Sequence, residues 1–394
     1  MKKPGLSLPQ QAYQSGKSPA KGPEAAPERI SASPWAAPRR RLTITRPDET
    51  VGPVGPRTAA FLVLAGLLSA AVVAGCRGQD PADVAALAAL RGKTIGVVSL
   101  DAVSTLETRY LLQEAAGLDA SQKASAVTFV EAPPESLESE LASGRIDAAV
   151  MSPAGAYRLL GDDRFRVLSE VSKEIRKLTG GPVVSTVLLT YPDVAEQKSD
   201  ALASLSRLLA QSVAYYDANE GMVLDTIAGR AGLDRAFLRW LAERQELPLG
   251  DLSPETQERL LRTWQAAAAL GDIDRAPDLT SVLFDPAKQA AANGMAGDRV
   301  TVSVALLDDA SRHAALYAIE QGLISSADID VDITYLSASA LAGAATTKQY
   351  DVIEALPLVL PASARQDVGL VVLSAGAADL GSTFLFIRAQ SDAP

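Results

Sequence analysis

Short strand-like runs alternate with helical segments from residue 91 onward, and this alternation constrains the fold more than any other feature. In the first half, compact runs rich in β-branched residues are separated by helix-spaced segments that stop at Gly117 and Gly144. Strands that alternate with helices pair in parallel and are covered by helices on both faces. The pattern therefore predicts an α/β protein, with strands at 94–99, 126–130, 147–151 and 183–190.

The middle of the chain has a different character. Residues 193–275 are expected to form helices broken by Gly and Pro, because apolar residues such as Leu202, Leu205 and Leu209 recur at spacings of three and four. Residues 286–298 have the composition of a linker. The strand pattern then resumes, with strands expected at 300–307, 329–336, 350–355, 369–374 and 383–388.

The segment RTAAFLVLAGLLSAAVVAGC at 57–76 is an apolar run after one basic residue, and it ends in small residues and Cys76. It resembles the lipobox of bacterial lipoproteins, in which such a Cys carries the lipid. An uncleaved membrane anchor is the alternative, because the run is close to spanning length. We expect 1–75 to be a disordered tail and signal peptide, 76–90 a tether, and Cys76, the only cysteine, the lipidation site.

Charge and residue inventory exclude several function classes. The net charge is −10, and basic residues are concentrated in the N-terminal tail, so the remaining chain is more acidic still. This argues against nucleic-acid binding and against an electrostatic membrane patch. The sequence has no Gly-rich phosphate loop, no Cys/His metal cluster and no nucleophile with a recognisable histidine partner. We expect no cofactor, no metal and no catalytic residue, hence no enzyme.

Five segments carry a resemblance to a known family. They are VSVALLDDASRHAALYAIEQGLI (302–324), YDVIEALPLVLPA (350–362), RGKTIGVVSLDAVSTLETRYLLQEAAGL (91–118), ELASGRIDAAVMSPAGA (140–156) and TYPDVAEQKSDALASLSRLLAQSVAYYDAN (190–219). Together they resemble ABC-transporter substrate-binding proteins of the NMT1/THI5-like, SsuA-like class. Their order is inverted relative to that family, in which segments of the 300–390 type come first. The chain therefore resembles a circular permutation, with the original ends joined by 286–298; a truncated tandem gene is the alternative.

The resemblance implies a bilobal periplasmic-binding-protein type II fold: two parallel-rich sheets with flanking helices and a hinge. A small lobe is expected at 91–190 and a large lobe at 191–394, joined by one covalent crossover near 180–195, with 179–182 as the candidate hinge. The implied function is capture of a small solute in the interlobe cleft and delivery to an ABC permease. The protein is expected to be a monomer, lipid-anchored on the extracytoplasmic face of the cell membrane. Alternatives are a ligand sensor without a transporter and a THI5-like pyrimidine-synthesis enzyme.

Ligands of open α/β sheets bind at the carboxyl ends of strands, which nominates polar residues there. In the large lobe the candidates are Asp308, Ser311, His313, Ser337 and Glu354. Asp308, Ser311 and Ser337 have helix capping as an alternative role, and His313, the only histidine, has a structural one. Glu354 lies in an apolar strand end, where a carboxylate needs a partner, either a ligand or a protein donor.

In the small lobe the corresponding candidates are Ser99, Asp101, Ser104, Thr105 and Ser152, again with helix capping as the alternative. Trp240 and Trp264 are expected in the core or an interface rather than at the ligand. The acidic residues near the expected cleft favour a polar, nitrogen-bearing solute, while serines and helix N-termini leave a sulfonate open.

Overall fold

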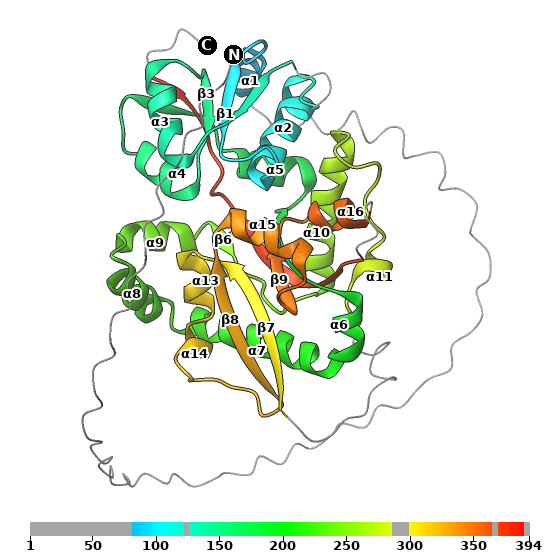
Figure 1. Ribbon diagram of the computed structural model, residues 1–394. Coiled ribbons are helices and arrows are strands. Elements are labelled where there is room, and N and C mark those ends of the chain that lie inside the picture. The colour runs from blue at the N-terminus through cyan, green and yellow to red at the C-terminus, as the bar shows by residue number, and fades with distance from the viewer. Residues whose placement is uncertain (1–80, 122–125, 286–298, 365–368, 390–394) are drawn as a thin grey trace, which may run out of the picture. The chain divides into compact units, whose positions relative to one another are not determined.

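The computed structural model describes residues 81–121, 126–285, 299–364 and 369–389. Within these ranges the chain forms two β-sheets with helices packed on them, which confirms the expected α/β class (Figure 1). None of the helices in this part of the chain is long and apolar enough to cross a bilayer. Cys76 and the rest of the expected signal lie outside the described residues.

The first sheet has five strands in the order β2-β1-β3-β11-β4. Strands β1 and β2, and β1 and β3, pair in parallel, whereas β11 is antiparallel to both β3 and β4. The bounds are β1 Thr94–Val97, β2 Thr128–Glu131, β3 Ala148–Val150, β4 Phe165–Ser169 and β11 Leu385–Arg388. Its helices are α1 Pro81–Ala88, α2 Val103–Ala116, α3 Pro134–Ser143, α4 Pro153–Leu159 and α5 Val171–Thr179.

The second sheet has six strands in the order β6-β10-β5-β9-β7-β8. Strand β7 pairs in parallel with β8 and β9, and β5 is antiparallel to β9 and β10. The bounds are β5 Val184–Thr190, β6 Gln245–Glu246, β7 Val300–Leu307, β8 Ile329–Leu336, β9 Val352–Ala355 and β10 Val371–Asp379. The helices are α6 Pro192–Gln197, α7 Ser199–Ala218, α8 Glu220–Ala231, α9 Arg235–Ala242, α10 Pro254–Ala269, α11 Leu279–Val282, α13 Ala310–Ala315, α14 Tyr317–Glu320, α15 Ala338–Thr347 and α16 Val359–Ala364.

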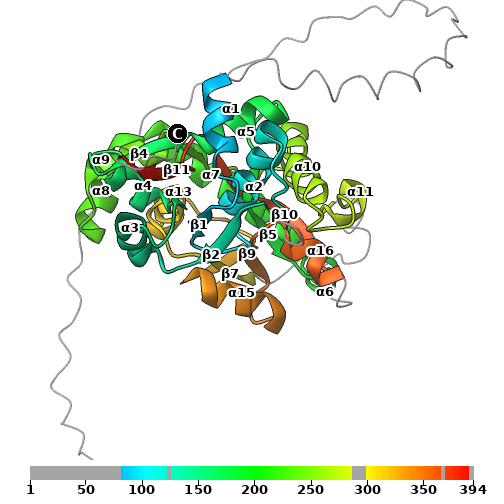
Figure 2. The same ribbon diagram turned by 90° about the horizontal axis from the view of Figure 1, so that it is seen from above.

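The strand pairing corrects the expected division of the chain at residue 190. Strand β5 lies before that boundary but pairs in the second sheet, and β11 lies near the C-terminus but pairs in the first (Figure 2). The described chain therefore passes between the two sheets twice, after β4 and after β10, and both crossings are covalent. The expectation of a single covalent crossover was wrong because period-2 patterning identifies a strand but not its sheet.

The N-terminal helix is also part of the fold rather than a tether. Leu87, in the last turn of α1, and Leu90, which follows that helix, are buried in the core of the first sheet. Apolar side chains at this spacing need a partner surface, and α1 packs on α2 and β4. Residues 81–90 of the expected tether therefore belong to the fold, and residues 76–80 lie outside the described residues.

Helices cover both faces of the second sheet. Helix α7 places Leu202, Leu205 and Leu209 against the side chains of β7 and β8, as its apolar spacing predicts. The opposite face is covered by α10, where Trp264 is fully buried and its indole N–H donates to the Pro357 carbonyl (3.0 Å). Helix α10 also contacts α2 of the first sheet (Figure 2), where Arg109 forms a bidentate ion pair with Asp272.

The crossing after β10 is tied down by one buried carboxylate. Asp379 accepts hydrogen bonds from the N–H groups of Gly381 (2.9 Å) and Ser382 (2.7 Å). It also accepts from the hydroxyls of Ser172 on α5 (2.9 Å) and Thr383 (2.6 Å). Four donors on one carboxylate fix the path of the chain as it leaves the second sheet for the first.

A second carboxyl group is buried beside this crossing without such donors. Glu107 on α2 is 3% exposed, and neither carboxyl oxygen has a hydrogen-bond partner among the described residues. Burial, with the Asp379 carboxylate nearby, raises the pKa of Glu107 well above its ordinary value. The folded state therefore favours the protonated form of Glu107.

We predict that Glu107→Gln raises the free energy of unfolding at pH 7–8 and leaves it nearly unchanged near pH 4. A raised folded-state pKa contributes stability that is fully present below the unfolded-state pKa and is lost as pH rises toward the folded-state value. Within that window the gain grows by up to about 1.4 kcal/mol per pH unit. Urea denaturation from pH 4 to pH 8 measures it.

Glu114→Gln is the matched control, because Glu114 is exposed on the same helix. Its effect is expected to stay within about 0.5 kcal/mol at every pH. A Glu107→Gln stability profile that runs parallel to that of the wild type would show that Glu107 does not titrate as a buried acid.

Candidate functional site

The carboxyl ends of three parallel strands bring the candidates of the second sheet to one edge. Asp308 follows β7, Ser337 follows β8, and Glu354 lies near the end of β9. Because β7 pairs with both neighbours, these positions lie close together, as the sequence predicts.

Glu354 is held by protein donors. It is 1% exposed and forms a bidentate ion pair with Arg312 on α13, whose Nη2 donates to Oε1 and whose Nε lies 3.1 Å from the same oxygen. The Thr186 hydroxyl of β5 donates to Oε1 (2.5 Å), and the Leu307 N–H donates to Oε2 (3.0 Å). Of the two roles left open by the sequence, this geometry fits the satisfied strand-end carboxylate.

The charges of this pair stabilise each other in a dry environment. Burial alone would raise the pKa of Glu354, but the Arg312 guanidinium, the Thr186 hydroxyl and the Leu307 N–H hold it below its ordinary value. Burial alone would lower the pKa of Arg312, and the carboxylates of Glu354 and Asp309 raise it instead. Both groups therefore remain charged across the neutral range.

Sequence reasoning missed Arg312. It is the third residue of α13, where the helix dipole disfavours a cation, and only 2% of it is exposed. A basic residue at that position needs nearby carboxylates, and Asp309 supplies a second one at 2.8 Å from Nη1. An arginine just inside a helix that follows a strand indicates a nearby carboxylate, but this local pattern does not identify Glu354 as the partner.

The loop after β7 distributes its polar groups differently from the expectation. Asp309, rather than Asp308 or Ser311, caps α13 by accepting from the Arg312 N–H (2.8 Å). Asp308 is exposed and lies 3.2 Å from His313 Nε2. The His313 ring packs on Tyr335 (ring centroids 3.9 Å apart), and its Nδ1 lies 3.1 Å from Glu320. His313 is thus engaged by protein groups on both ring nitrogens.

The serines at this edge have mixed roles. Ser337 caps α15 by accepting from the Ala340 N–H (3.3 Å), and its hydroxyl lies 3.1 Å from that of Ser339. Ser311 instead donates to the side-chain oxygen of Gln245 (3.0 Å) and lines a pocket.

The first-sheet candidates form a corresponding loop set. The Ser99 hydroxyl accepts from the Asp101 N–H (3.3 Å), and the Ser99 carbonyl accepts from the buried Thr105 hydroxyl (2.7 Å). Ser104 is half-buried on α2. Ser152 follows β3 and caps α4 by accepting from the Gly155 N–H (3.4 Å). Ser99, Thr105 and Ser152 therefore organise their own loops, and Asp101 is exposed.

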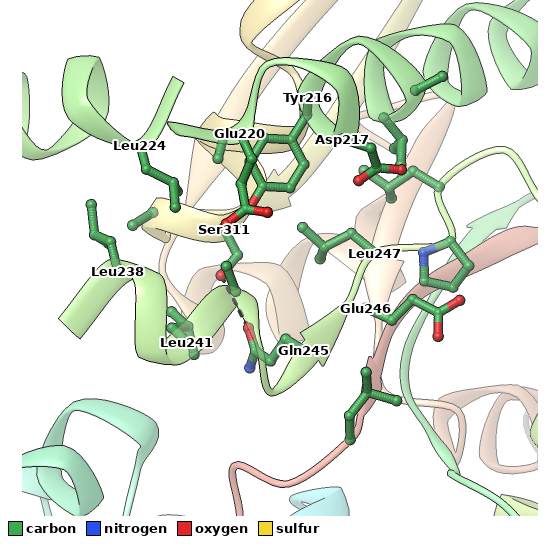
Figure 3. A pocket seen from close by; sticks show the side chains of 18 of the residues that line it. Tyr216, Asp217, Glu220, Leu224, Leu238, Leu241, Gln245, Glu246, Leu247 and Ser311 are labelled. Atoms are coloured by element: carbon green, nitrogen blue, oxygen red, sulfur yellow. Dashed lines mark hydrogen bonds between the residues drawn. The ribbon is translucent and has the colours of Figure 1, made fainter. Parts of the chain in front are cut away.

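A pocket of about 390 Å³ lies beside Ser311, between α7, α8, α9, β6 and α13 (Figure 3). Tyr216, Asp217 and Glu220 lie on one wall, at the junction of α7 and α8. The opposite wall is mostly apolar and comes from α9 and the segment after β6. Its larger side chains are Leu238, Leu241 and Leu247, with Gln245 beside them. Sequence analysis did not identify this pocket, because its walls come from separate helices.

The described residues contain no group of three or more His, Cys, Asp or Glu side chains placed to hold a metal ion. The segment expected as hinge, 179–182, follows α5, and Gly180 adopts a positive φ of 76° at the C-cap of that helix. Trp240 lies in an aromatic cluster with Tyr157, Phe237 and Phe384, and Trp264 lies in the core, as expected.

Comparison with known proteins gives weak likenesses only. No protein-family model matches the sequence, and no curated protein matches it. Among solved structures, the periplasmic aliphatic sulphonate-binding protein SsuA from Escherichia coli is 13% identical, with a TM-score of 0.26; the alignment covers 76% of this chain and 62% of that one. This chain thus spans less than two thirds of the length of that protein.

Two further solved structures are similar at the same level. A binding-protein component of an ABC phosphonate transporter from Pseudomonas aeruginosa is 11% identical, with a TM-score of 0.28 and coverage of 77% of this chain and 71% of that one. YehZ from E. coli is 12% identical, with a TM-score of 0.26 and coverage of 76% and 80%.

We predict that removing either member of the Arg312–Glu354 pair destabilises the protein by about 3–5 kcal/mol, because the remaining charge is left buried. Arg312→Met and Glu354→Leu are the single variants, and urea denaturation measures both. The double variant Arg312→Met/Glu354→Leu is expected to be more stable than either single variant, since it buries no unpaired member of the pair. Additive losses in the double variant would contradict the coupling.

Proposed function

We propose that this protein is an extracytoplasmic solute-binding protein, which captures a small polar solute between its two α/β units and delivers it to an ABC permease. One observation carries the proposal. Strand β5 follows the first-sheet strands in the chain but pairs in the second sheet, and β11 follows the second-sheet strands but pairs in the first. Through this exchange of β5 and β11, two covalent crossings join the sheets. A pair of crossings forms a natural hinge, and closure of two units about a hinge is a common way to enclose a ligand.

The order of the resembling segments supports the same proposal. The five strands of the first sheet, β2-β1-β3-β11-β4, have the same arrangement as five of the six strands of the second, β8-β7-β9-β5-β10, to which β6 adds at the edge. The segment that resembles the family's first strand forms β7, and the GKTIGV segment forms β1. Each is the strand flanked by two parallel neighbours in its own sheet. A circular permutation keeps such an arrangement while changing only where the chain begins.

Closure about the hinge predicts that the distance between the two units becomes shorter when a solute binds. In a Cys76→Ser background, spin labels at Asp163→Cys in the first unit and Asp332→Cys in the second are expected to move closer on adding a solute that raises the thermal midpoint. Native mass spectrometry of the purified protein, followed by thermal-shift screening, identifies such a solute.

Labels at Glu135→Cys and Asp163→Cys form the matched control, because both residues are exposed in the first unit. Their separation is expected to stay constant. A stabilising solute that leaves both distance distributions unchanged would contradict capture by closure.

We also propose that Cys76 carries a lipid anchor. Cys76→Ala is expected to abolish incorporation of labelled palmitate and to leave an uncleaved precursor or release the protein from the membrane fraction. Palmitate incorporation into the wild type that persists in Cys76→Ala would place the anchor elsewhere.

A further inference from the structure

The acids that the sequence places at the expected ligand edge are already engaged. Glu354 and Asp309 hold Arg312, and Asp308 contacts His313. A cationic group of a solute finds no buried, uncompensated carboxylate among these three. The negative charge available to a ligand lies next to them instead, in the pocket that Ser311 borders.

The charged side chains that line that pocket are all acidic. None of the described residues that line it is Lys, Arg or His, whereas four carry carboxylates: Asp217, Glu220, Glu246 and Asp251. Glu246 pairs with Arg259 outside the lining, and Asp251 accepts from the hydroxyls of Ser253 and Thr256. Asp217 and Glu220 are exposed residues of the lining, and neither has an ion-pair partner within the described ranges, so the pocket borders two uncompensated carboxylates.

The titration of neighbouring groups agrees with a negative local potential. Burial and the Glu246 carboxylate raise the pKa of Asp217. Burial, together with the carboxylates of Glu220 and Asp217, raises the pKa of the Tyr216 phenol. Burial is the larger cause of both shifts, and the neighbouring carboxylates add to it with the same sign.

The rest of the lining fits an aliphatic chain. Leu224, Leu238, Leu241 and Leu247 form the apolar part, and Figure 3 shows them around the space below Glu220. A volume of about 390 Å³ lies within the range of small-molecule sites, which combine an apolar lining with a few polar groups. The Tyr216 ring adds an aromatic face, the kind of surface that attracts organic cations.

We infer that this pocket binds a small organic cation with an aliphatic body, whose ammonium group contacts Asp217 and Glu220 and whose alkyl part lies on Leu238, Leu241 and Leu247. The Ser311–Gln245 pair closes one side of the site and keeps the amide N–H groups of Gln245 near it. The inference rests on the proposed function and names a solute class; its seat is lined by the second unit and by Leu380 of the crossing after β10. Helix α13, fixed by Arg312 and Glu354, provides a rigid wall.

A series of n-alkylammonium ions from methyl to hexyl, titrated calorimetrically into the mature protein, tests the inference. Each added methylene is expected to strengthen binding by up to about fourfold until the pocket is filled, because a buried methylene contributes about 0.8 kcal/mol. Binding is expected to weaken as salt rises from 50 to 500 mM. Butanesulfonate is expected neither to bind nor to compete.

The variant Asp217→Asn/Glu220→Gln is expected to weaken alkylammonium binding about tenfold or more, because it removes both uncompensated charges and keeps their shape. The control Asp328→Asn/Asp332→Asn makes the same change of net charge at exposed positions outside the pocket, and its affinity is expected to match the wild type. Circular dichroism and thermal midpoints check that both variants fold.

Three outcomes would overturn the inference: no alkylammonium binds, the two double variants bind equally well, or butanesulfonate competes. The proposed function is judged separately. If another solute shortens the distance between the two units while Asp217→Asn/Glu220→Gln leaves its affinity unchanged, solute capture stands and this pocket is not its seat.

Discussion

The exchange of β5 and β11 is the constraint on which the rest of the structure depends. Strand β11 lies between β3 and β4, so the first sheet would be split in two without this last strand of the described residues. Strand β5 holds the same position in the second sheet, between β9 and β10. An unpaired strand edge buried in a sheet leaves several backbone groups unsatisfied. The first sheet is therefore complete only when β11 joins it from the end of the second sheet's segment. The second sheet is complete only when β5 joins it from the end of the first sheet's segment.

The buried ion cluster extends this constraint to the candidate site. Glu354 of β9 accepts from Thr186 of the exchanged strand β5 and from the N–H of Leu307 at the end of β7. Arg312 joins that carboxylate to α13, so the helix is fixed on the edge where three strands end. Burying these charges costs desolvation free energy, and the hydrogen bonds between them fix the positions of the groups. The pocket beside α13 thus has one wall that is set before any ligand arrives.

The spacing of apolar residues along the sequence predicted helices and strands better than it predicted which strands and side chains pair. Strands β7 and β8 have the expected bounds, because long β-branched runs there are closed by polar residues. The segment between β7 and β8 forms two short helices, α13 and α14, that meet at Leu316. Strand β4 was missed, since Phe165–Ser169 is short and contains an arginine. The Arg312–Glu354 pair and the sheet membership of β11 depend on contacts between distant residues, which no local pattern encodes.

Native-state hydrogen exchange of the β11 amides tests the exchanged fold most directly. Amides of Phe386 and Ile387 pair with residues of β3 and β4, so they are expected to exchange as slowly as those of Ile95 and Gly96 in β1, through the same unfolding step. A common dependence on denaturant for the two strands supports the exchange. Rapid exchange in β11, while β1 remains protected, would contradict it, because the C-terminal strand would then not be part of the first sheet.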